Sequence, residues 1–513
     1  MKGRRRILAD YEAIDAENVV RVLQEDALPV HAANAAQTQY LWDYYRGQQP
    51  ILKRVKDVRP EINNRIVENH AQEIVAFKIG YQLAEPMQYT CRTYASDADG
   101  TDASLEDINE LNTLMFAEDK ASHDRDLFEW MLVCGVGYRM AEADSEDDFE
   151  EGGAPFEIHT LDPRTTFLVR SSAYHRKPLM AVWIGRDPDD EEPIYNCFTK
   201  SACYRVKGGA VIEKAPHTYG CIPIVEYQLN NARMGVFEPV LALLDAINAV
   251  ESNRIDGIEQ TVQALMKFVN CDVTEAKFES MLKLGAVSVA TTEGTVGEAD
   301  VDIIKNDLDQ TSTQTTKDDL YQAIVNICGM PNRNGTSGSS SDTGAAVLLR
   351  DGWTLAESHA KSYELQMKRS ERDFLRCVLS ICAQSAGCDI DLRIRDIELA
   401  FNRRNYENIA TKSQVLTGML GCSSVHPRLA FEACGMFSDP EAAWLESKAW
   451  QEEQRAEALA ALPDELAENA VGAMAGEQPQ GDDDDGQDGA GQSQAGQPEP
   501  EKGDDAGKPA SGI

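Results

Sequence analysis

The sequence predicts an α+β protein that is mainly helical, with a long helical hairpin in its second half and an acidic end that does not fold. Three observations carry this prediction. Helical and strand-like segments share residues 1–236, and an apolar stripe of helical period begins at Pro239. The last fifty or so residues contain no aromatic residue and are rich in acids and glycine.

Size and composition describe a folded protein. The chain has 513 residues, of which 42% are apolar, and this length accommodates about three domains of ~150 residues. No stretch approaches the ~18 apolar residues that would span a bilayer, and the opening MKGRRRILADYEAID follows its basic cluster with acids where a signal peptide has an apolar core. We therefore expect no membrane partner.

The cysteines and histidines indicate neither disulfides nor metal. Twelve cysteines are scattered among apolar positions without a C-x-x-C pair, and the eight histidines form no H-x-x-x-H pattern. Reduced, mostly buried thiols are the expected state, and neither a metal site nor a cofactor is predicted.

Residues 1–236 contain both helical and strand-like segments. Helices are expected at residues 34–45, 64–83, 105–116 and 121–132. The later strand-like runs are FEIHTL, TTFLVR, LMAVWIG, IYNCFT, CYRV and IPIVEYQL, separated by Asp-Pro, Gly-Gly and proline-rich turns. These short spacings favour an antiparallel sheet.

The clearest helical period begins at Pro239, a residue suited to the first turn of a helix. One face of the expected helix carries Val240, Leu244, Ile247, Ile255, Ile258, Val262, Leu265 and Val269. The pattern predicts one helix of about 30 residues, roughly 45 Å long at 1.5 Å per residue. A helix of this length is either a core helix or part of an extended stem.

The following segments complete a hairpin. Short strand candidates, AVSVAT and DVDII, lie in residues 271–306, and a second helix is expected from Gln310 to Cys328. The polar stretch GMPNRNGTSGSSSDTGAAVLLRDG interrupts the pattern at residues 329–352, before a further helix from about Thr343 past Ile381. One face of that helix is basic, through Lys361, Lys368, Arg369, Arg372 and Arg376. Such a strip is usually solvated, and contact with nucleic acid is the alternative.

The net charge of −37 limits the function. Residues 464–513 hold thirteen acids and two lysines, so the tail contributes −11. Strong acidity argues against tight gripping of DNA phosphates, although DNA can still slide past such a surface. The polar composition of the tail predicts disorder.

Enzyme motifs are missing from the sequence. CGVGYRM, residues 134–140, lacks the third glycine of a dinucleotide-binding loop, and neither a G-x-x-x-x-G-K-[ST] loop nor a G-x-S-x-G elbow occurs. The acidic run 482–485 lies in the tail and has no calcium-loop spacing. A non-enzymatic protein is expected.

Several segments, taken in order, carry a family resemblance. YLWDYYRGQQPIL, NNRIVENHAQEIVAFKIGYQLAEPMQY, LDPRTTFLV and IPIVEYQLNNARMGVFEPVLALLDAINAVESNRIDGIEQ resemble the portal proteins of tailed bacteriophages, specifically the SPP1-type portal family. The resemblance spans roughly residues 38–385. Where the family usually has Ser-Gly, a small residue and an aliphatic, this chain reads SDTGAAV from Ser341.

The resemblance implies a portal fold with an α/β wing, a two-helix stem, a small α/β clip, a tunnel loop, a long helix, a helical crown and a disordered acidic tail. The corresponding segments are 1–236 (wing), 237–270 (first stem helix), 271–306 (clip), 307–328 (second stem helix), 329–343 (tunnel loop), 344–398 (long helix), 399–462 (crown) and 463–513 (tail).

The resemblance also implies a ring, most simply a dodecamer, at one capsid vertex of the virion, assembled in the host cytoplasm. Double-stranded DNA would pass through it during genome packaging and ejection. Its further partners would be the terminase large subunit, the major capsid and scaffolding proteins, and the head-tail adaptor. A capsid-associated scaffold without a channel is the alternative, and an unrecognised nucleic-acid-processing enzyme is a third.

The tunnel loop is the site that the resemblance places in the channel. Its expected DNA-facing residues are Asn332, Arg333, Asn334, Gly335, Thr336, Ser337, Gly338, Ser339, Ser340 and Ser341. Lys267, on the first stem helix, is a second candidate channel cation. Polar Gly/Ser-rich loops can adapt one by one to DNA whose helical symmetry the ring does not share.

Overall fold

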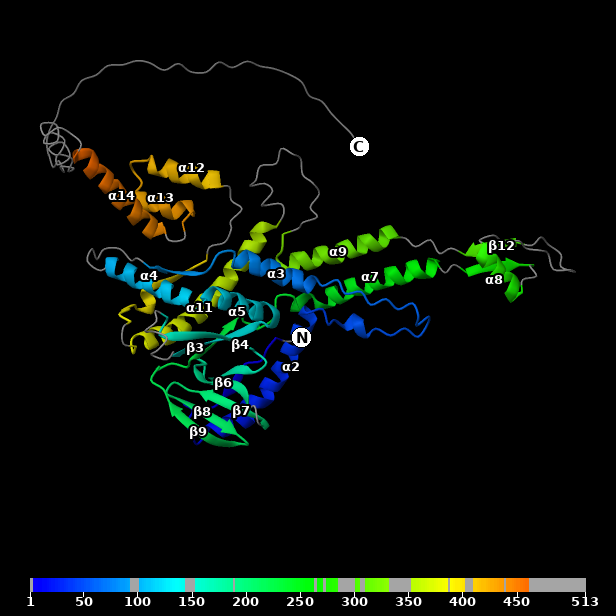
Figure 1. Ribbon diagram of the computed structural model, residues 1–513, viewed down its shortest axis with the longest axis horizontal. Helices are drawn as coiled ribbons and strands as arrows, with labels where there is room; N and C mark the ends of the chain where they lie inside the picture. The colour runs from blue at the N-terminus through cyan, green and yellow to red at the C-terminus, as the bar shows by residue number, and fades with distance from the viewer. Residues whose placement is uncertain are drawn as a thin grey trace, which may run out of the picture. The chain divides into compact units, whose positions relative to one another are not determined.

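The structure is a computed structural model of the whole chain and confirms the α+β class (Figure 1). It describes residues 3–92, 101–143, 153–187, 190–262, 265–270, 274–284, 300–304, 310–331, 352–385, 388–401, 409–437 and 440–460. The chain divides into two compact units, residues 1–443 and 444–513.

A six-stranded sheet forms one layer of the first unit. Its order is β1 (Ile7–Ala9), β5 (Thr166–Ser171), β6 (Pro178–Asp187), β7 (Asp190–Phe198), β8 (Ala202–Lys207) and β9 (Ala210–Pro216). The pairings from β5 to β9 are antiparallel, as expected, whereas β1 joins β5 in parallel. A helical segment packs its apolar residues on this sheet, comprising α1 (Val19–Arg21), the π-helical turn η1 (Val22–Ala27) and α2 (Leu28–Tyr45).

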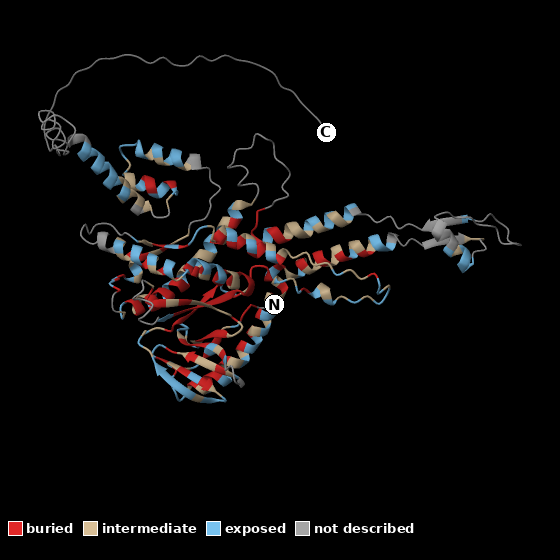
Figure 2. Cartoon of the chain, viewed as in Figure 1, coloured by how far each residue is buried: buried red, intermediate tan, exposed pale blue. Residues whose placement is uncertain are grey.

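A second, three-stranded sheet lies under the helices. Its order is β10 (Ile224–Gln228), β3 (Val136–Ala143) and β4 (Phe156–Leu161), all antiparallel. The helices of the large core around it are α3 (His70–Gln82), α4 (Thr101–Ala117), α5 (Lys120–Cys134) and α11 (Trp353–Cys382). Figure 2 shows that buried residues concentrate in this region. A two-stranded sheet of β2 (Gln88–Cys91) and β13 (Ile397–Ala400), the latter preceded by η4 (Ile394–Asp396), closes one side.

The predicted hairpin is present, with one correction. After η3 (Glu238–Val240), α7 spans Leu241–Val262 and packs against α9, which spans Gln310–Cys328 as predicted (Figure 1). The expectation of one helix reaching Val269 is wrong. Residues 265–269 form β11 and pair antiparallel with β12 (Asp300–Ile304), beside α8 (Glu275–Leu284).

The reason for this error is physical. Val262, Leu265 and Val269 fit a helical period by spacing alone, but LMKFV also has the β-branched and aromatic composition that suits a strand. The partner strand DVDII then favours the strand conformation. All five residues of 265–269 pair with it, from Leu265 opposite Ile304 to Val269 opposite Asp300.

The C-terminal helices follow the expected pattern. They are α12 (Ile409–Leu420), α13 (Pro427–Cys434) and α14 (Pro440–Ala460), within the range expected to be helical. The acidic tail beyond residue 460 lies outside the described residues, as do AVSVAT and residues 343–351 of the predicted long helix.

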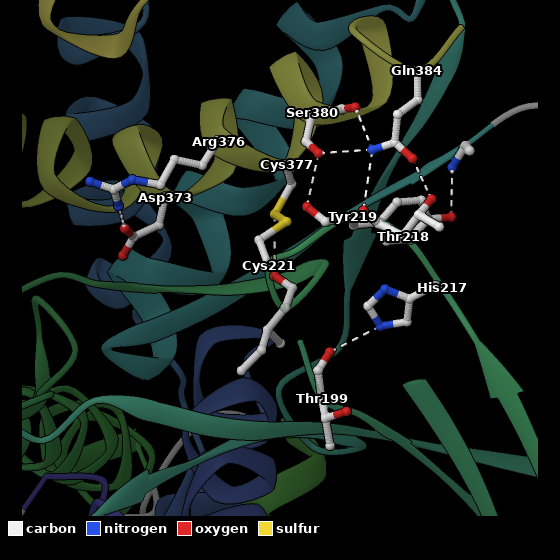
Figure 3. The surroundings of a disulfide bond; sticks show 12 residues. Thr199, His217, Thr218, Tyr219, Cys221, Asp373, Arg376, Cys377, Ser380 and Gln384 are labelled. Atoms are coloured by element: carbon white, nitrogen blue, oxygen red, sulfur yellow. Dashed lines mark hydrogen bonds and ion pairs between the residues drawn. A yellow bond between two sulfur atoms is a disulfide. The ribbon is translucent and has the colours of Figure 1, made fainter. Parts of the chain in front are cut away.

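The prediction of reduced cysteines is wrong for one pair. Cys221, just before β10, and Cys377 of α11 form a disulfide with their Cα atoms 5.9 Å apart (Figure 3). Alongside it, Ser380 Oγ donates to the Tyr219 carbonyl at 2.9 Å. The pairing was invisible in the sequence because 156 residues separate the two cysteines. Most of the other cysteines among the described residues are buried.

Glu371 of α11 holds the centre of the large core. Its carboxylate lies 3.2 Å from Lys120 Nζ on α5 and 3.4 Å from Arg139 Nη1 on β3. The hydroxyls of Tyr89 and Tyr227 each donate to it at 2.6 Å. One side chain thus joins α11 to two strands of the three-stranded sheet, to α5 and to β2.

Charges in this cluster alternate. Asp124 accepts from both Lys120 and Arg139, so two cations lie between two carboxylates. Burial alone would raise the pKa of Glu371, but Lys120, Arg139 and the tyrosine hydroxyls lower it to about 2. The carboxylate therefore contributes its full stability above its ordinary pKa of 4.5, and this contribution is lost as pH falls towards about 2.

Removing this carboxylate should destabilise the protein strongly. We expect Glu371→Ala to lower the free energy of unfolding by about 3–5 kcal/mol, because it leaves buried cations short of a partner. The stability of the variant should also fall less than that of the wild type as the pH is lowered from 4.5 to about 2. Urea denaturation at several pH values measures both effects.

The matched control is Asp373→Ala on the same helix. Asp373 pairs with Arg376 at the surface (Figure 3), and exposed pairs contribute about 0–1 kcal/mol. Equal stabilities for the two variants would contradict the central role of Glu371.

Candidate functional site

The sequence-predicted site residues differ in where the structure places them. Asn332 to Ser341 lie outside the described residues, between Pro331 and Gly352. Lys267 lies on β11, where its cross-strand partner is Asp302, and not on a stem helix. The structure therefore does not bring Lys267 to α7, but it does define how the predicted loop is attached.

The described residues on either side of the segment 332–351, which carries the predicted loop, lie close together. A Cβ atom placed on Gly352 would lie 3.6 Å from the Met330 carbonyl oxygen and 3.7 Å from Pro331 Cα. The chain thus leaves the end of α9 and returns to the start of α11 within van der Waals distance. A loop with adjacent ends can change its length or composition without altering the core that carries it.

The end of α9 has a defined cap. Met330 N–H donates to the Val325 carbonyl at 2.9 Å and Gly329 N–H to the Asn326 carbonyl at 3.3 Å, which is the hydrogen-bond pattern of a Schellman motif. Gly329 takes the left-handed conformation this motif needs, with φ +62°. A Cβ on Gly329 would lie 2.8 Å from ring atoms of His359.

A buried lysine reinforces this cap. Lys78 of α3 donates from Nζ to the Gly329 carbonyl at 3.3 Å and lies 5.6 Å from the centroid of the Tyr363 ring. Burial lowers the pKa of Lys78 to about 8. Burial and then the neighbouring Lys78 lower the pKa of His359. The end of α9, from which the chain leaves towards the predicted loop, is thereby fixed to both α3 and α11.

A hollow lies beside the return of the loop. Its volume is about 470 Å³, and its walls include Phe77, Tyr81, Arg125 and Trp353, the first residue of α11. The rings of Phe77 and Tyr81 stack with centroids 5.8 Å apart, and Tyr81 OH donates to Glu357 at 2.8 Å. Aromatic side chains thus form a firm platform where the loop re-enters the core.

The α7–α9 hairpin is held by an apolar root and a polar middle. Leu244 and Ile247 of α7 share the large core with Ile324 of α9. Farther out, Lys317 of α9 lies 2.9 Å from Glu251 of α7 and 3.0 Å from Glu68. Burial along α7 falls towards its outer end in Figure 2, where Ile258, Glu259 and Gln260 are exposed.

The connection between α2 and α3 also binds α7. This segment, residues 46–69, is called the strap. Asp256 of α7 lies 2.9 Å from Lys56 Nζ and 3.1 Å from Arg54 Nη2, and it accepts the Asn64 N–H at 2.8 Å. Burial would raise the pKa of Asp256, but the hydrogen bonds from Asn64 and Lys56 lower it. Asp256 therefore holds the strap to the hairpin together with Ser252 and Asn248, which accept from the Ile66 and Glu68 N–H groups.

Sequence reasoning missed the strap and the Lys78–Gly329 anchor. The motif Gly329-Met330-Pro331 carried a turn signal. Lys78 and Asp256, however, looked like ordinary polar positions on helices, because their partners lie 251 and 200 residues away.

The basic strip on α11 is partly neutralised by acids. Lys368 lies 2.5 Å from Glu398 and Lys361 lies 3.6 Å from Glu357. Arg376 pairs with Asp373. These pairs favour the solvated interpretation of the strip over a nucleic-acid surface.

Two further observations concern ligands and membranes. In the part of the chain that the structure describes, no cluster of three or more histidine, cysteine, aspartate or glutamate residues could hold a metal ion. Within that same part, no helix is long and apolar enough to cross a membrane.

Comparison with known proteins identifies one family. The family model described as phage portal protein, SPP1 Gp6-like, matches residues 26–459. No curated protein sequence matches significantly.

Solved structures of gene transfer agent particles are similar to this chain at low identity. The neck of a native gene transfer agent particle, computed with C12 symmetry, has a TM-score of 0.42 and 12% identity over 71% of this chain and 89% of that chain. The virion of a native gene transfer agent particle has a TM-score of 0.44 and 13% identity over 78% of this chain and 93% of that chain.

The cap of α9 can be tested with a pair of glycine variants. We expect Gly329→Ala to destabilise the protein by about 1–2 kcal/mol through its left-handed backbone, and further through displacement of the His359 ring. The control, Gly80→Ala within α3, meets nothing within 4 Å and should stabilise by about 1 kcal/mol. Thermal denaturation measures the change in stability of each variant. Changes of the same sign in both would contradict the role of Gly329 in capping α9.

Proposed function

The chain belongs to the SPP1 Gp6-like family of phage portal proteins, and from this premise we propose that it forms a ring at one capsid vertex through which double-stranded DNA enters and leaves. Family membership over residues 26–459 is the observation that carries the proposal. The α7–α9 hairpin and the loop that follows it supply the parts that a conduit requires.

We keep the proposed regions and change only the two boundaries of the clip. Residues 1–236 correspond to the wing and the α7–α9 hairpin to the stem. Because α7 ends at Val262, we place the clip from about residue 263 to 309 instead of 271 to 306. The loop from residue 329 is the tunnel loop, α11 the long helix, and α12 to α14 the crown.

The tunnel loop is proposed to contact DNA weakly. A ring and a DNA helix do not share symmetry, so each subunit meets a different part of the backbone at any instant. Asn332 to Ser341 contribute hydroxyls, amides and glycines, which can adapt without one fixed register. Arg333 contributes one cation per subunit for weak phosphate contact, and Lys267 contributes a second from the clip strand β11.

The proposed partners follow from this role. The ring, most simply a dodecamer, would dock the terminase large subunit during packaging and the head-tail adaptor afterwards, and would contact the major capsid and scaffolding proteins. ATP hydrolysis belongs to the terminase in this proposal, so the portal itself needs no cofactor. Assembly would take place in the host cytoplasm and the ring would remain in the virion.

Ring formation tests the proposed function directly. We expect the purified chain to form closed rings with a central channel in negative-stain electron microscopy, and light scattering should give a mass many times 56.6 kDa. A monodisperse monomer at micromolar concentration would contradict the portal proposal. Particles without a channel would favour the scaffold alternative.

Charge reversal in the loop tests the DNA path. We expect Arg333→Glu to leave ring assembly intact, since surface changes typically shift stability by about ±0.5 kcal/mol. Packaging should fall, because one added acid per subunit places a ring of negative charge where phosphates pass, within a Debye length of about 8 Å. An in vivo packaging assay measures the genome content of the heads.

The control for this variant is Arg395→Glu, the same charge reversal at an exposed arginine in η4, before β13. Equal packaging by the two variants would place residue 333 outside the channel.

A further inference from the structure

A hollow lies against the Cys221–Cys377 disulfide. Its volume is about 300 Å³, within the range of sites that accept small molecules. Cys221 is one of its lining residues and is half-buried, whereas Cys377 is 1% exposed. A small molecule in the hollow therefore reaches Cys221 more easily than its partner.

The walls of the hollow carry more positive than negative charge. Their charged residues are Arg170, Lys177, Lys200, Arg376, Glu226 and Asp373. Glu226 already lies 2.8 Å from Arg233 and 3.6 Å from Arg170. Asp373 pairs with Arg376 on α11 (Figure 3). Both lysines are exposed, so they leave an excess of positive charge that favours an anionic ligand.

Neighbouring arginines add to this positive charge. Burial and then Arg233 lower the pKa of Arg6. Arg170 and Arg176 lower it further, whereas Glu226 opposes them. In a chain whose net charge is −37, cations therefore gather at the wall of the hollow that Arg170 forms.

The two segments that carry the cysteines are also held together without sulfur. Ser380 Oγ of α11 donates to the Tyr219 carbonyl at 2.9 Å (Figure 3). One turn later, Gln384 Nε2 donates to the Thr218 carbonyl at 3.2 Å. Opening the disulfide therefore leaves both cysteines placed to close it again.

We propose that a small anionic thiol enters the hollow and exchanges with the Cys221–Cys377 disulfide. The cations attract this thiol and favour its thiolate, which is the form that attacks a disulfide. A reducing cytosol then keeps the cysteine pair open, and an oxidising medium closes it. The surrounding thiol thereby sets whether α11 is covalently joined to the segment before β10. This inference goes beyond the proposed function and does not depend on ring formation.

The exchange consists of two substitutions at sulfur. The first thiolate attacks Cys221 Sγ, which forms a mixed disulfide and releases Cys377 as a thiolate. Cys377 then takes up the proton that the incoming thiol has lost, and its Sγ lies 3.3 Å from the Ile222 carbonyl oxygen, an acceptor for the new S–H.

A second thiolate attacks the small thiol's sulfur in the mixed disulfide and releases Cys221, which takes up the second proton. Two small thiols are thus oxidised to one small disulfide while the protein disulfide is reduced to two thiols. The reverse reaction closes the pair, with the small disulfide as its oxidant.

Reduced glutathione and its glycine ethyl ester test the charge requirement. The two thiols are similar in size, but the ester lacks one carboxylate. At matched thiolate concentrations and low salt, we expect glutathione to open the disulfide of the full chain about fivefold faster than the ester. This preference should vanish at high salt, where the charges are screened. Alkylation of the released thiols followed by mass spectrometry measures the rates, and the first mixed disulfide should lie on Cys221.

Substitution of the two lysines tests the hollow as the route. Lys177→Gln combined with Lys200→Gln should slow glutathione about fivefold and leave the rate with the ester nearly unchanged. The matched control is Lys53→Gln combined with Lys361→Gln, two exposed lysines that do not line the hollow. The control should react as the wild type does with both thiols.

Each contrary result overturns the inference. Equal rates for the two thiols at low salt, or a lysine variant that keeps the wild-type preference, would show that the hollow does not select the thiol by charge. A first mixed disulfide on Cys377, or two free thiols at these positions in oxidised protein, would contradict the exchange itself. None of these results changes ring formation, so the portal proposal stands or falls separately.

Discussion

The ionic contact of Glu371 is the constraint on which the rest of the structure depends. It fixes the long helix α11 against α5 and the three-stranded sheet, with Lys120 and Arg139 as its cations. The same helix begins at Trp353, just after the segment that carries the proposed tunnel loop. Because α11 is held at its centre, the entry point of the loop is fixed relative to α3 and to the root of the hairpin.

Other buried carboxylates also pair with cations, each with a single partner named here. Arg4 lies 2.6 Å from Glu238 at the root of the hairpin, so the basic cluster near the N-terminus contributes to the core. Arg233 lies 2.8 Å from Glu226 on β10, and Lys56 lies 2.9 Å from Asp256 on α7. Removing one partner of such a pair leaves a buried charge, which is costly even where the pair itself adds little net stability. These contacts therefore specify which distant segments meet.

The sequence could predict what depends on local pattern. The bounds of α9 and the strands β5 to β8 follow from periodicity and turn residues, whereas the terminal helices were expected only from the family resemblance. It could not predict features that depend on distant partners. Residues 265–269 became a strand because DVDII lies beside them, and Cys221 met Cys377 across 156 residues. The anchor of the loop was equally hidden, since Lys78 and Gly329 come together only after α3 packs against α9 and α11.

Neighbouring side chains within one short segment of the strap face different surroundings. Arg54 and Lys56 face Asp256 and stabilise the subunit, whereas Val55 between them faces outward. Alternation along an extended backbone makes this separation possible, because neighbouring residues point to opposite sides. A change at Asp256 would remove the carboxylate that Arg54, Lys56 and Asn64 share and would loosen the strap. A change at Val55 alters only the outer surface, so the hairpin keeps its geometry.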